Sequence, residues 1–284
     1  MEPVLLLNDK KYELIKVQRE NISAIYKCGD EYLRIGREDK IERDLETHRK
    51  MERAGFPIAK ILEEGTFQDM SYFVETSVGE ITAGKLFTQD VAESGTISDV
   101  HFDAFLAVVE KFAQAQLHTK VDVVDFETFA KGIHLDILCK ELPQHSEKIQ
   151  AVFSDIKGRL SSFPFVLTHG DFNPHNIYPA GVIDFEDSFY GPFGYDIISA
   201  LVHINYFPDS QDYEYFAKYH FSSNQRQKYL DAVDTISQKA GLQKISDYTA
   251  DFEFCRAIWH LVRMHEWPKL QQFRYDLFIE KFLK

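Results

Sequence analysis

The stretch from Thr168 to Asp187 constrains this chain more than any other. It reads T-H-G-D-F-N-P-H-N-I-Y-P-A-G-V-I-D-F-E-D and follows an apolar run at residues 163–167. That run predicts a strand that ends in a polar loop, and residues 177–183 predict a tight β-hairpin, because a Pro-Ala-Gly turn separates two apolar pairs. Three polar side chains are therefore expected at the ends of apolar strands: Asp171, Asn176 and Asp184.

These three side chains suit phosphoryl transfer. A carboxylate such as that of Asp171 accepts the proton of an attacking hydroxyl group. The amide oxygen of Asn176 and the carboxylate of Asp184 are hard oxygen ligands, the kind that Mg²⁺ prefers when it is bound to nucleotide phosphates. The residues therefore predict Asp171 as the catalytic base and Asn176 and Asp184 as the metal ligands.

The order and spacing of these residues resemble the kinase catalytic loop, H-x-D-x-x-x-x-N, which is followed by a metal-binding aspartate. His169-Gly170-Asp171 stands where protein kinases have H-R-D, and residues 183–186, I-D-F-E, stand where they have D-F-G. H-G-D together with I-D-F-E resembles the aminoglycoside phosphotransferase family of small-molecule kinases, which is similar to choline and homoserine kinases. Residues 191–196 resemble that family's G-P-x-x-Y-D run, so Asp196 is expected to be a helix cap or a loop anchor.

The resemblance implies an α+β, protein-kinase-like fold of two lobes. Residues 1–78 would form a small β-rich N-terminal lobe that binds the nucleotide. Residues 79–284 would form a larger, mostly helical C-terminal lobe with the catalytic loop and the substrate pocket. The implied activity is ATP-dependent transfer of a phosphoryl group to a hydroxyl of a small molecule, with Mg²⁺ and ATP as cofactors. GTP in place of ATP, and the identity of the acceptor, stay open.

Two other interpretations of the motif stay open. A metal-dependent phosphoester hydrolase would use the side chains of His169, Asp171, His175 and Asp184, and would release inorganic phosphate without an acceptor. A catalytically silent module of the same fold would bind nucleotide without turnover. The complete set of Asp171, Asn176 and Asp184 argues against a silent module, and the hairpin that leads to Asp184 favours a kinase over a hydrolase.

Composition excludes some classes of protein. The formal net charge is −13, which argues against a nucleic-acid partner and is compatible with a cationic acceptor. No apolar run approaches the ~20 residues of a membrane span, and the N-terminus lacks a signal-peptide pattern. The three cysteines are widely spaced, so we expect reduced thiols and a cytoplasmic protein. Four acids near the C-terminus are candidates to contact a cationic acceptor: Asp209, Asp212, Asp251 and Glu253.

Arg34 is the candidate phosphate ligand of the first lobe. Residues 22–27 and 31–35 predict two strands joined by a tight turn. The second strand holds Arg34 where a kinase places a lysine that contacts the α- and β-phosphates, and the resembling family often has arginine there. A guanidinium group offers a rigid fork of donors that suits phosphate. Lys27, on the neighbouring strand, is the competing candidate.

A helix is predicted from Asp39 to Ala54, because Gly55 and Pro57 form a normal helix stop. In the resembling family this helix carries an acid that pairs with the nucleotide-binding base. Counting back from the turn gives Asp44 that role, with Glu46 as the alternative. Asp44 departs from the family, where glutamate is usual, and the hairpin before Asp184 is shorter than in most kinase relatives.

Further strands are predicted at residues 58–62, 65–67 and 71–74. A linker, Glu75 to Gly79, follows them. In a kinase architecture the backbone groups of this linker bind adenine, so Glu75 and Ser77 are assigned to the nucleotide by count alone. Beyond residue 80 the pattern becomes helical, with helices expected at residues 100–118 behind a Ser98 cap and at residues 149–160.

Overall fold

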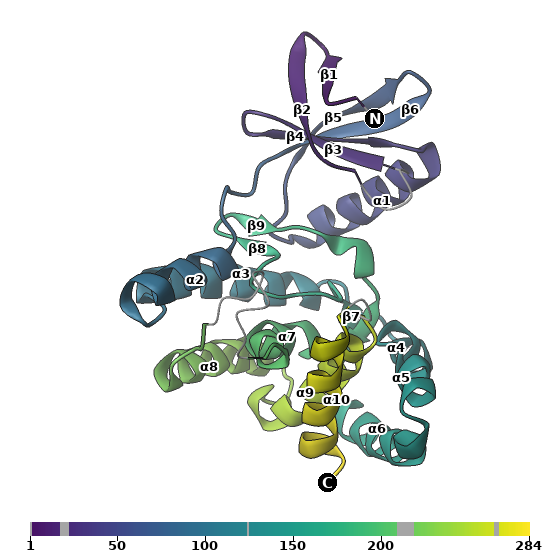
Figure 1. Cartoon of the computed structure of the whole chain (residues 1–284), viewed down its shortest axis with the longest axis vertical. Coiled ribbons are helices and arrows are strands. Elements are labelled where there is room, and N and C mark those ends of the chain that lie inside the picture. Colours follow the sequence, from purple (N-terminus) through teal and green to yellow (C-terminus); the bar gives the residue numbers. More distant parts are fainter. Residues whose placement is uncertain (1, 18–22, 124, 209–218, 264–266) are drawn as a thin grey trace. The chain divides into compact units, whose positions relative to one another are not determined.

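The computed structural model describes residues 2–17, 23–123, 125–208, 219–263 and 267–284 (Figure 1). The chain forms two compact units, and the first contains residues 1–80 together with residues 178–183. The second contains residues 81–177 and 184–284. The short segment at residues 178–183 thus belongs to the first unit. The first unit is therefore not one continuous stretch of the chain.

A six-stranded antiparallel sheet makes up most of the first unit, in the order β1-β2-β3-β4-β6-β5. The strands are β1 Val4–Leu7, β2 Lys10–Val17, β3 Ser23–Cys28, β4 Glu31–Gly36, β5 Ile61–Phe67 and β6 Met70–Thr76. The tight turn predicted between β3 and β4 is confirmed, since Cys28 pairs with Glu31. The two short strands predicted at 58–62 and 65–67 are wrong in their bounds, because β5 is one strand that begins at Ile61.

Alternation along β4 decides which side chains of the sheet are available for chemistry. Leu33 and Ile35 are fully buried on one face, in a core that also contains Tyr12 and Tyr26. Arg34 points to the opposite face, because successive side chains of a strand alternate. Leu33 and Ile35 of β4 therefore pack into the core of the sheet, and Arg34 between them places its charged side chain on the other face.

Helix α1 (Glu38–Ala54) lies on the first unit's sheet and packs its apolar side against β4 and β6. Ile41 and Leu45 contact Phe73. The helix ends as predicted: Gly55 has a left-handed φ of 85° and donates its N–H to the Glu52 carbonyl oxygen. The face of the sheet that carries Arg34 is therefore also the face that α1 covers.

The predicted β-hairpin is confirmed as β8 (Ile177–Tyr178) and β9 (Gly181–Val182). Its turn is bonded to the first unit, since the Ala180 and Val182 N–H groups donate to the carbonyl oxygens of Val78 and Pro57 at 3.1 Å and 2.8 Å. A Cβ atom at residue 181 would lie 2.6 Å from the Pro57 carbonyl oxygen, so this close approach requires glycine.

The second unit is mostly helical (Figure 1). Its helices are α2 Ala83–Ser94, α3 Asp99–Leu117, α4 Phe126–Gly132, α5 Leu135–Glu141, α6 Ser146–Leu160, α7 Tyr195–Val202, α8 Ser223–Lys239, α9 Thr249–Leu261 and α10 Pro268–Phe282. Short 3₁₀ turns occur at Pro143–His145, Phe185–Asp187, His203–Tyr206 and Ser246–Tyr248. The predicted cap of α3 is confirmed, since the Ser98 hydroxyl accepts the His101 N–H.

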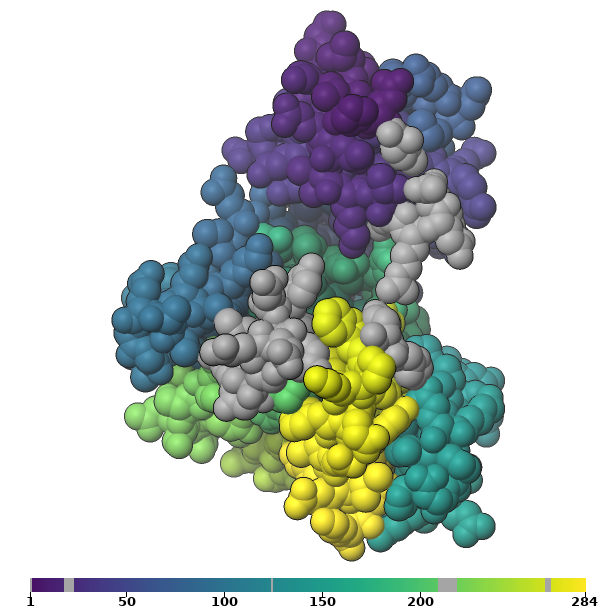
Figure 2. All heavy atoms as spheres, viewed as in Figure 1, coloured from purple at the N-terminus to yellow at the C-terminus, as the bar shows by residue number. Residues whose placement is uncertain are grey.

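Helix α9 is the central helix of this unit. It packs against α5, α6, α7 and α10, and every residue from Phe252 to Leu261 is buried. Helix α10 lies at the surface beside the teal helices α4 and α5 (Figure 2). No helix in the described ranges is long and apolar enough to cross a membrane.

A two-stranded sheet within the second unit positions the polar loop. Strand β7 (Phe165–Leu167) confirms the strand predicted before the loop, and it pairs with β10 (Tyr190–Pro192) in antiparallel register. The sequence did not predict β10, because glycine and proline are poor strand formers. Gly191 leaves little room for a side chain there, since a Cβ atom would lie 3.0 Å from the Phe129 ring.

Candidate active site

The loop after β7 follows a tight path next to the segment around Asp187. Thr168 donates both its N–H and its hydroxyl to the Phe189 carbonyl oxygen, at 2.8 Å and 2.7 Å. Gly170 has a φ of +83°, and a Cβ atom there would lie 2.1 Å from the Asp187 carbonyl oxygen. The middle residue of H-G-D is therefore glycine for a steric reason.

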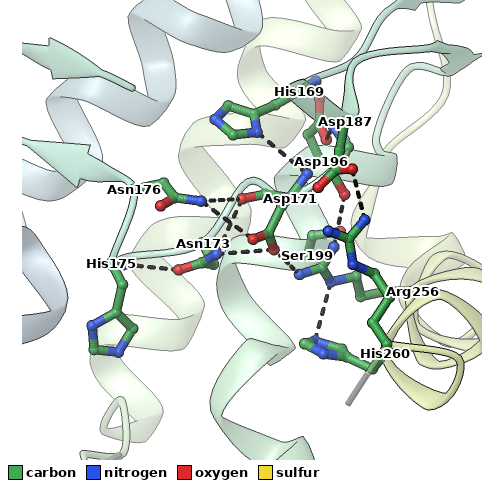
Figure 3. Close-up of polar contacts among 12 residues, drawn as sticks. His169, Asp171, Asn173, His175, Asn176, Asp187, Asp196, Ser199, Arg256 and His260 are labelled. Carbon is green, nitrogen blue, oxygen red and sulfur yellow. Dashed lines mark hydrogen bonds and ion pairs between the residues drawn. The ribbon is translucent and has the colours of Figure 1, made fainter. Parts of the chain in front are cut away.

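Asp196, in the first turn of α7, anchors this loop. Its fully buried carboxylate accepts the backbone N–H groups of His169 and Gly170, at 2.7 Å and 3.2 Å (Figure 3). The Gln116 side chain donates to the same carboxylate at 2.7 Å. Burial raises the pKa of Asp196 to about 6, although the nearby His169 and the backbone donors act in the opposite direction. The expectation that Asp196 is a loop anchor is confirmed.

Asp171 is held at the middle of the loop with its side chain 27% exposed. Its Oδ1 accepts from Asn173 Nδ2 at 3.0 Å and from Arg256 Nη2 at 2.5 Å (Figure 3). Among the described residues, its Oδ2 accepts only from Asn176 Nδ2, at the longer distance of 3.3 Å. The two amide side chains also donate to the Asp171 backbone oxygen, at 3.1 Å and 2.9 Å. The carboxylate is thus oriented, with Oδ2 its less engaged oxygen.

Asn176 and Asp184 offer oxygen ligands of the predicted kind. Asn176 donates its amide nitrogen to Asp171, and its amide oxygen accepts no hydrogen bond from the described residues. Asp184 is exposed directly after the β8–β9 hairpin and has a left-handed φ of 69°, which aspartate tolerates better than most residues. An amide oxygen and a carboxylate fit the donor preference of Mg²⁺, so both residues stay predicted metal ligands.

The arrangement argues against the hydrolase interpretation. His175 donates its N–H to Asn173 Oδ1 at 2.9 Å, and its ring points away from Asp171 (Figure 3). Within the described ranges, no group of at least three His, Cys, Asp or Glu side chains is placed to hold a metal ion. The four residues proposed for a hydrolytic metal site are therefore not gathered into one.

Two further side chains donate to Asp171 that the sequence did not predict, Arg256 of α9 and Asn173 of the loop. The Arg256 side chain is completely buried and also donates to the Gly170 carbonyl oxygen. Arg256 is separated from the loop by more than eighty residues and stands in an otherwise aromatic segment, so nothing in the sequence pattern pointed to it. Asn173 had a signal, since asparagine two residues after an aspartate in a loop is a common turn residue.

In the first unit, Arg34 pairs with Glu75. Arg34 Nε donates to Glu75 Oε1 at 2.8 Å, and His48 Nδ1 lies 3.9 Å from Glu75 Oε2. The Arg34 guanidinium also lies 6.0 Å from the centre of the Phe73 ring. Lys27, the competing cation, has its Nζ 5.4 Å from the centre of the Tyr32 ring. The structure therefore pairs Arg34 with the strand residue Glu75.

The two other residues assigned to the nucleotide are engaged within the first unit. Asp44 accepts from Lys40 Nζ at 2.9 Å, one helical turn away, so its recorded ion pair is with Lys40. The shorter side chain of aspartate, compared with the usual glutamate, is consistent with this local pair. Ser77 donates its N–H to the Asp30 carbonyl oxygen at 2.7 Å and its hydroxyl to the Gly79 carbonyl oxygen. A contact of Ser77 with a nucleotide base would therefore use its carbonyl oxygen.

The C-terminal acids that were candidates for a cationic acceptor are also engaged. Asp251 forms two hydrogen bonds with Arg159, at 2.9 Å and 2.7 Å. Glu253 is buried and accepts from Lys281 Nζ at 2.6 Å. Asp209 and Asp212 lie outside the described residues. Neither Asp251 nor Glu253 therefore carries an argument for a cationic acceptor.

Comparison with solved structures places this site in a kinase-like fold. The chain is similar to a choline/ethanolamine kinase family protein from Mesorhizobium loti, at 16% identity and a TM-score of 0.57, over 94% of this chain and 86% of that one. It is also similar to the aminoglycoside phosphotransferase APH(3'')-Id from Streptomyces rimosus in complex with ADP and streptomycin, at 12% identity and a TM-score of 0.52, over 87% and 92%. An aminoglycoside-3'-phosphotransferase of type VIII matches at 14% identity and a TM-score of 0.51, over 87% and 93%.

At these identities the likeness shows the fold, and it confirms the α+β, kinase-like fold predicted from the sequence. No curated protein matches the chain. The model of the phosphotransferase enzyme family matches residues 21–230, which contain the whole catalytic motif and most of the chain. The chain therefore belongs to the phosphotransferase enzyme family.

Proposed function

We propose that the protein is an ATP-dependent small-molecule kinase that transfers the γ-phosphoryl group to a hydroxyl of its acceptor. The observation that carries this proposal is the geometry of Asp171, a part-exposed carboxylate oriented by Asn173, Asn176 and Arg256 on an anchored loop. A base that accepts a proton from an alcohol must be oriented and reachable, and Asp171 meets both conditions.

The reaction transfers one phosphoryl group and one proton. The acceptor oxygen forms a bond to the γ-phosphorus, the bond from that phosphorus to the β–γ bridging oxygen breaks, and ADP leaves. Asp171 orients the attacking hydroxyl and takes its proton as the new bond forms. Such a base contributes a factor of roughly 10²–10⁴ in rate, and positioning contributes much of the remainder.

Asn176 and Asp184 would hold Mg²⁺ through their oxygen atoms. When bound, the ion offsets the negative charge of the nucleotide phosphates. Within the first unit, Arg34 would contact the phosphates, with its guanidinium oriented by Glu75 at 2.8 Å. Glu75 and Ser77 belong to the segment Glu75 to Gly79 that we assign to the nucleotide base. Asp44 would contribute through its ion pair with Lys40. ATP is the proposed donor, and GTP is tested beside it.

The acceptor is proposed as a small hydroxyl compound. Support comes from the family and from the solved structures, one of which is described as a choline/ethanolamine kinase family protein and another as a complex with streptomycin. Amino alcohols, aminoglycosides, homoserine and sugars are therefore the first acceptors to test, and a cationic acceptor is compatible with the net charge of −13. No nucleic-acid or membrane partner is proposed, and the three free cysteines are consistent with the reducing cytoplasm.

ADP release tests the proposal. The protein is incubated with Mg·ATP, or with Mg·GTP, and with each member of a panel of aminoglycosides, amino alcohols, homoserine and neutral polyols. Asp171→Asn is the matched control, because it keeps the size of the side chain and removes the base. Acceptor-dependent ADP release that is lost in Asp171→Asn is the expected result. Turnover by Asp171→Asn close to that of the wild type would overturn the role of Asp171.

A further inference from the structure

Arg256 makes the only ion pair that Asp171 forms within the described ranges, at 2.5 Å, and the chemistry proposed above does not use it. Its side chain is completely buried, whereas that of Asp171 is 27% exposed. A buried guanidinium group loses its hydration, so it is stable in the fold only where other groups accept its N–H donors. The groups that accept hydrogen bonds from Arg256 therefore indicate the role of this side chain.

The guanidinium group reaches three separate acceptors. Nη1 donates to the Gly170 carbonyl oxygen at 2.8 Å, and Nη2 donates to Asp171 Oδ1 at 2.5 Å. Nε donates to His260 Nε2 at 3.1 Å (Figure 3). Arg256 thus holds both the peptide group that precedes Asp171 and the Asp171 carboxylate itself.

Helix α9 places Arg256 for these contacts. Trp259 and His260 follow it at three and four residues, so all three side chains lie on neighbouring parts of one helical face. The guanidinium carbon lies 4.1 Å from the centre of the Trp259 ring, which covers the planar group. Burial, together with the nearby Arg256 and His203, keeps the pKa of His260 well below its usual range, so His260 is a neutral ring that accepts the Nε–H bond.

We propose that Arg256 is a positioning residue that sets which carboxylate oxygen of Asp171 faces the acceptor hydroxyl. Arg256 and Asn173 both donate to Oδ1, whereas Oδ2 accepts one hydrogen bond from the described part of the chain, from Asn176 at 3.3 Å. Oδ2 is then the oxygen that takes the proton. This inference rests on the proposed kinase function, and it adds a residue from a distant helix to the reacting loop.

Arginine suits this role better than lysine. Its planar group carries donors on different nitrogen atoms, which can hold a carbonyl and a carboxylate at once, whereas a lysine ammonium is a single point on a flexible stem. Arg256→Lys therefore keeps the positive charge and loses the simultaneous hydrogen bonds to Gly170 and Asp171. Comparison of the wild type with Arg256→Lys therefore separates the effect of positioning Asp171 from the effect of a positive charge beside it.

Arg274 of α10 provides a matched control. Its side chain is also almost fully buried, and it donates to the carbonyl oxygens of Tyr206 and His260, at 2.9 Å and 3.0 Å. It makes no contact with the catalytic loop among the contacts recorded for the described residues. Arg274→Lys therefore reproduces the structural cost of weakening a buried arginine in the same helical unit without touching Asp171.

The experiment compares the full-length wild type, Arg256→Lys, Arg274→Lys and His260→Asn. Steady-state kinetics with the best acceptor give kcat and the KM for Mg·ATP, and crystal structures give the position of the Asp171 carboxylate. Arg256→Lys is expected to lower kcat by a factor on the order of 10–10², since a misplacement of about 1 Å has that effect, with KM for Mg·ATP nearly unchanged. His260→Asn keeps Arg256 and should lower kcat by a smaller factor.

Three results would overturn the inference. These are a kcat near that of the wild type in both Arg256→Lys and His260→Asn, equal losses in Arg256→Lys and Arg274→Lys, or an Asp171 carboxylate that stays in place in Arg256→Lys. If Arg256→Lys does not fold, the kcat and structure of His260→Asn decide. If the wild type itself releases no acceptor-dependent ADP, the proposed function fails, and the position of Asp171 in the crystal structures still decides the inference.

Discussion

The carboxylate of Asp196 lies 2.7 Å from the backbone nitrogen of His169, and both residues are fully buried. One buried acid at the start of α7 therefore sets the path of the catalytic loop, which carries Asp171 two residues further on. Asp196 holds the loop by accepting hydrogen bonds from the backbone N–H groups of His169 and Gly170.

Asp196→Asn should damage the loop although the two side chains have the same shape. The amide NH₂ group cannot accept a hydrogen bond, so at least one backbone N–H of His169 or Gly170 loses its partner. An unsatisfied buried donor costs about 1–3 kcal/mol in the free energy of unfolding, and we expect kcat to fall on the order of tenfold or more. Urea unfolding and steady-state kinetics measure the two effects, and a variant with unchanged kcat would show that the anchor is dispensable.

The pKa of Asp196 predicts opposite pH effects on activity and stability. Burial raises this pKa to about 6, above the value of about 3.9 for an exposed aspartate. As the pH falls below 6 the carboxyl group gains a proton and loses acceptor capacity, so activity should fall. The folded state binds this proton more tightly than the unfolded state, so the stability contributed by Asp196 is lost as the pH rises through 6 and returns below it.

The check is a comparison of wild type and Asp196→Asn between pH 8 and about 4.5. The difference in their free energies of unfolding should shift in favour of the wild type as the pH falls, because only the wild type takes up the proton. A difference that stays constant over this range would contradict the raised pKa.

Gly170→Ala should be strongly destabilising. The new Cβ atom would lie 2.1 Å from the Asp187 carbonyl oxygen, and the residue would keep a φ of +83°. The loop would have to move, so we expect a loss of about 2–4 kcal/mol in the free energy of unfolding together with loss of turnover. Gly158→Ala is the matched control, because residue 158 lies in α6 with open space around it, and it should gain about 0.5–1 kcal/mol. Equal effects of the two substitutions would contradict the steric account.

The ion pair of Arg34 predicts which acid matters for nucleotide binding. Glu75 lies 2.8 Å from Arg34 Nε, whereas Asp44 pairs with Lys40. Glu75→Gln should therefore weaken the binding of Mg·ATP by about tenfold, the cost of losing a charge-assisted contact, and Asp44→Asn should weaken it less. Isothermal calorimetry gives both dissociation constants. A larger effect of Asp44→Asn would contradict this and would show that Asp44 of α1 is the acid that matters for nucleotide binding, as the family resemblance implies.

Asp184→Ala should remove the dependence of nucleotide binding on Mg²⁺. The carboxylate is exposed after the hairpin and is the hard oxygen ligand that we propose for the ion. Wild-type affinity for ATP should fall on removal of Mg²⁺ with a chelator, while the affinity of Asp184→Ala should be low with and without the ion. A variant that keeps the magnesium response of the wild type would exclude Asp184 as a ligand.

The sequence predicted what depends on neighbouring residues. The strand before the loop, the hairpin at residues 177–183 and the ends of α1 and α3 follow from apolar spacing, caps and glycine stops, and the structure confirms them. The fold class was implied by the resemblance of the motif to the aminoglycoside phosphotransferase family, and the similar solved structures confirm it.

Contacts between distant residues could not be predicted in this way. Arg256 meets Asp171 only because α9 packs beside the loop, and β10 pairs with β7 although its own sequence disfavours a strand. The partner of Arg34 was open for the same reason, since cross-strand pairing brings Glu75 next to it. Local pattern carries no information on which charged groups a fold brings together.

Transfer of the γ-phosphoryl group to a hydroxyl acceptor is tested most directly by ³¹P NMR. The wild-type protein is incubated with Mg·ATP and the best acceptor of the panel, and Asp171→Asn serves as the control. For a kinase we expect a phosphomonoester signal of the acceptor that grows in step with ADP and is absent from the control. Inorganic phosphate growing in step with ADP, with no phosphorylated acceptor, would contradict it and show a hydrolase.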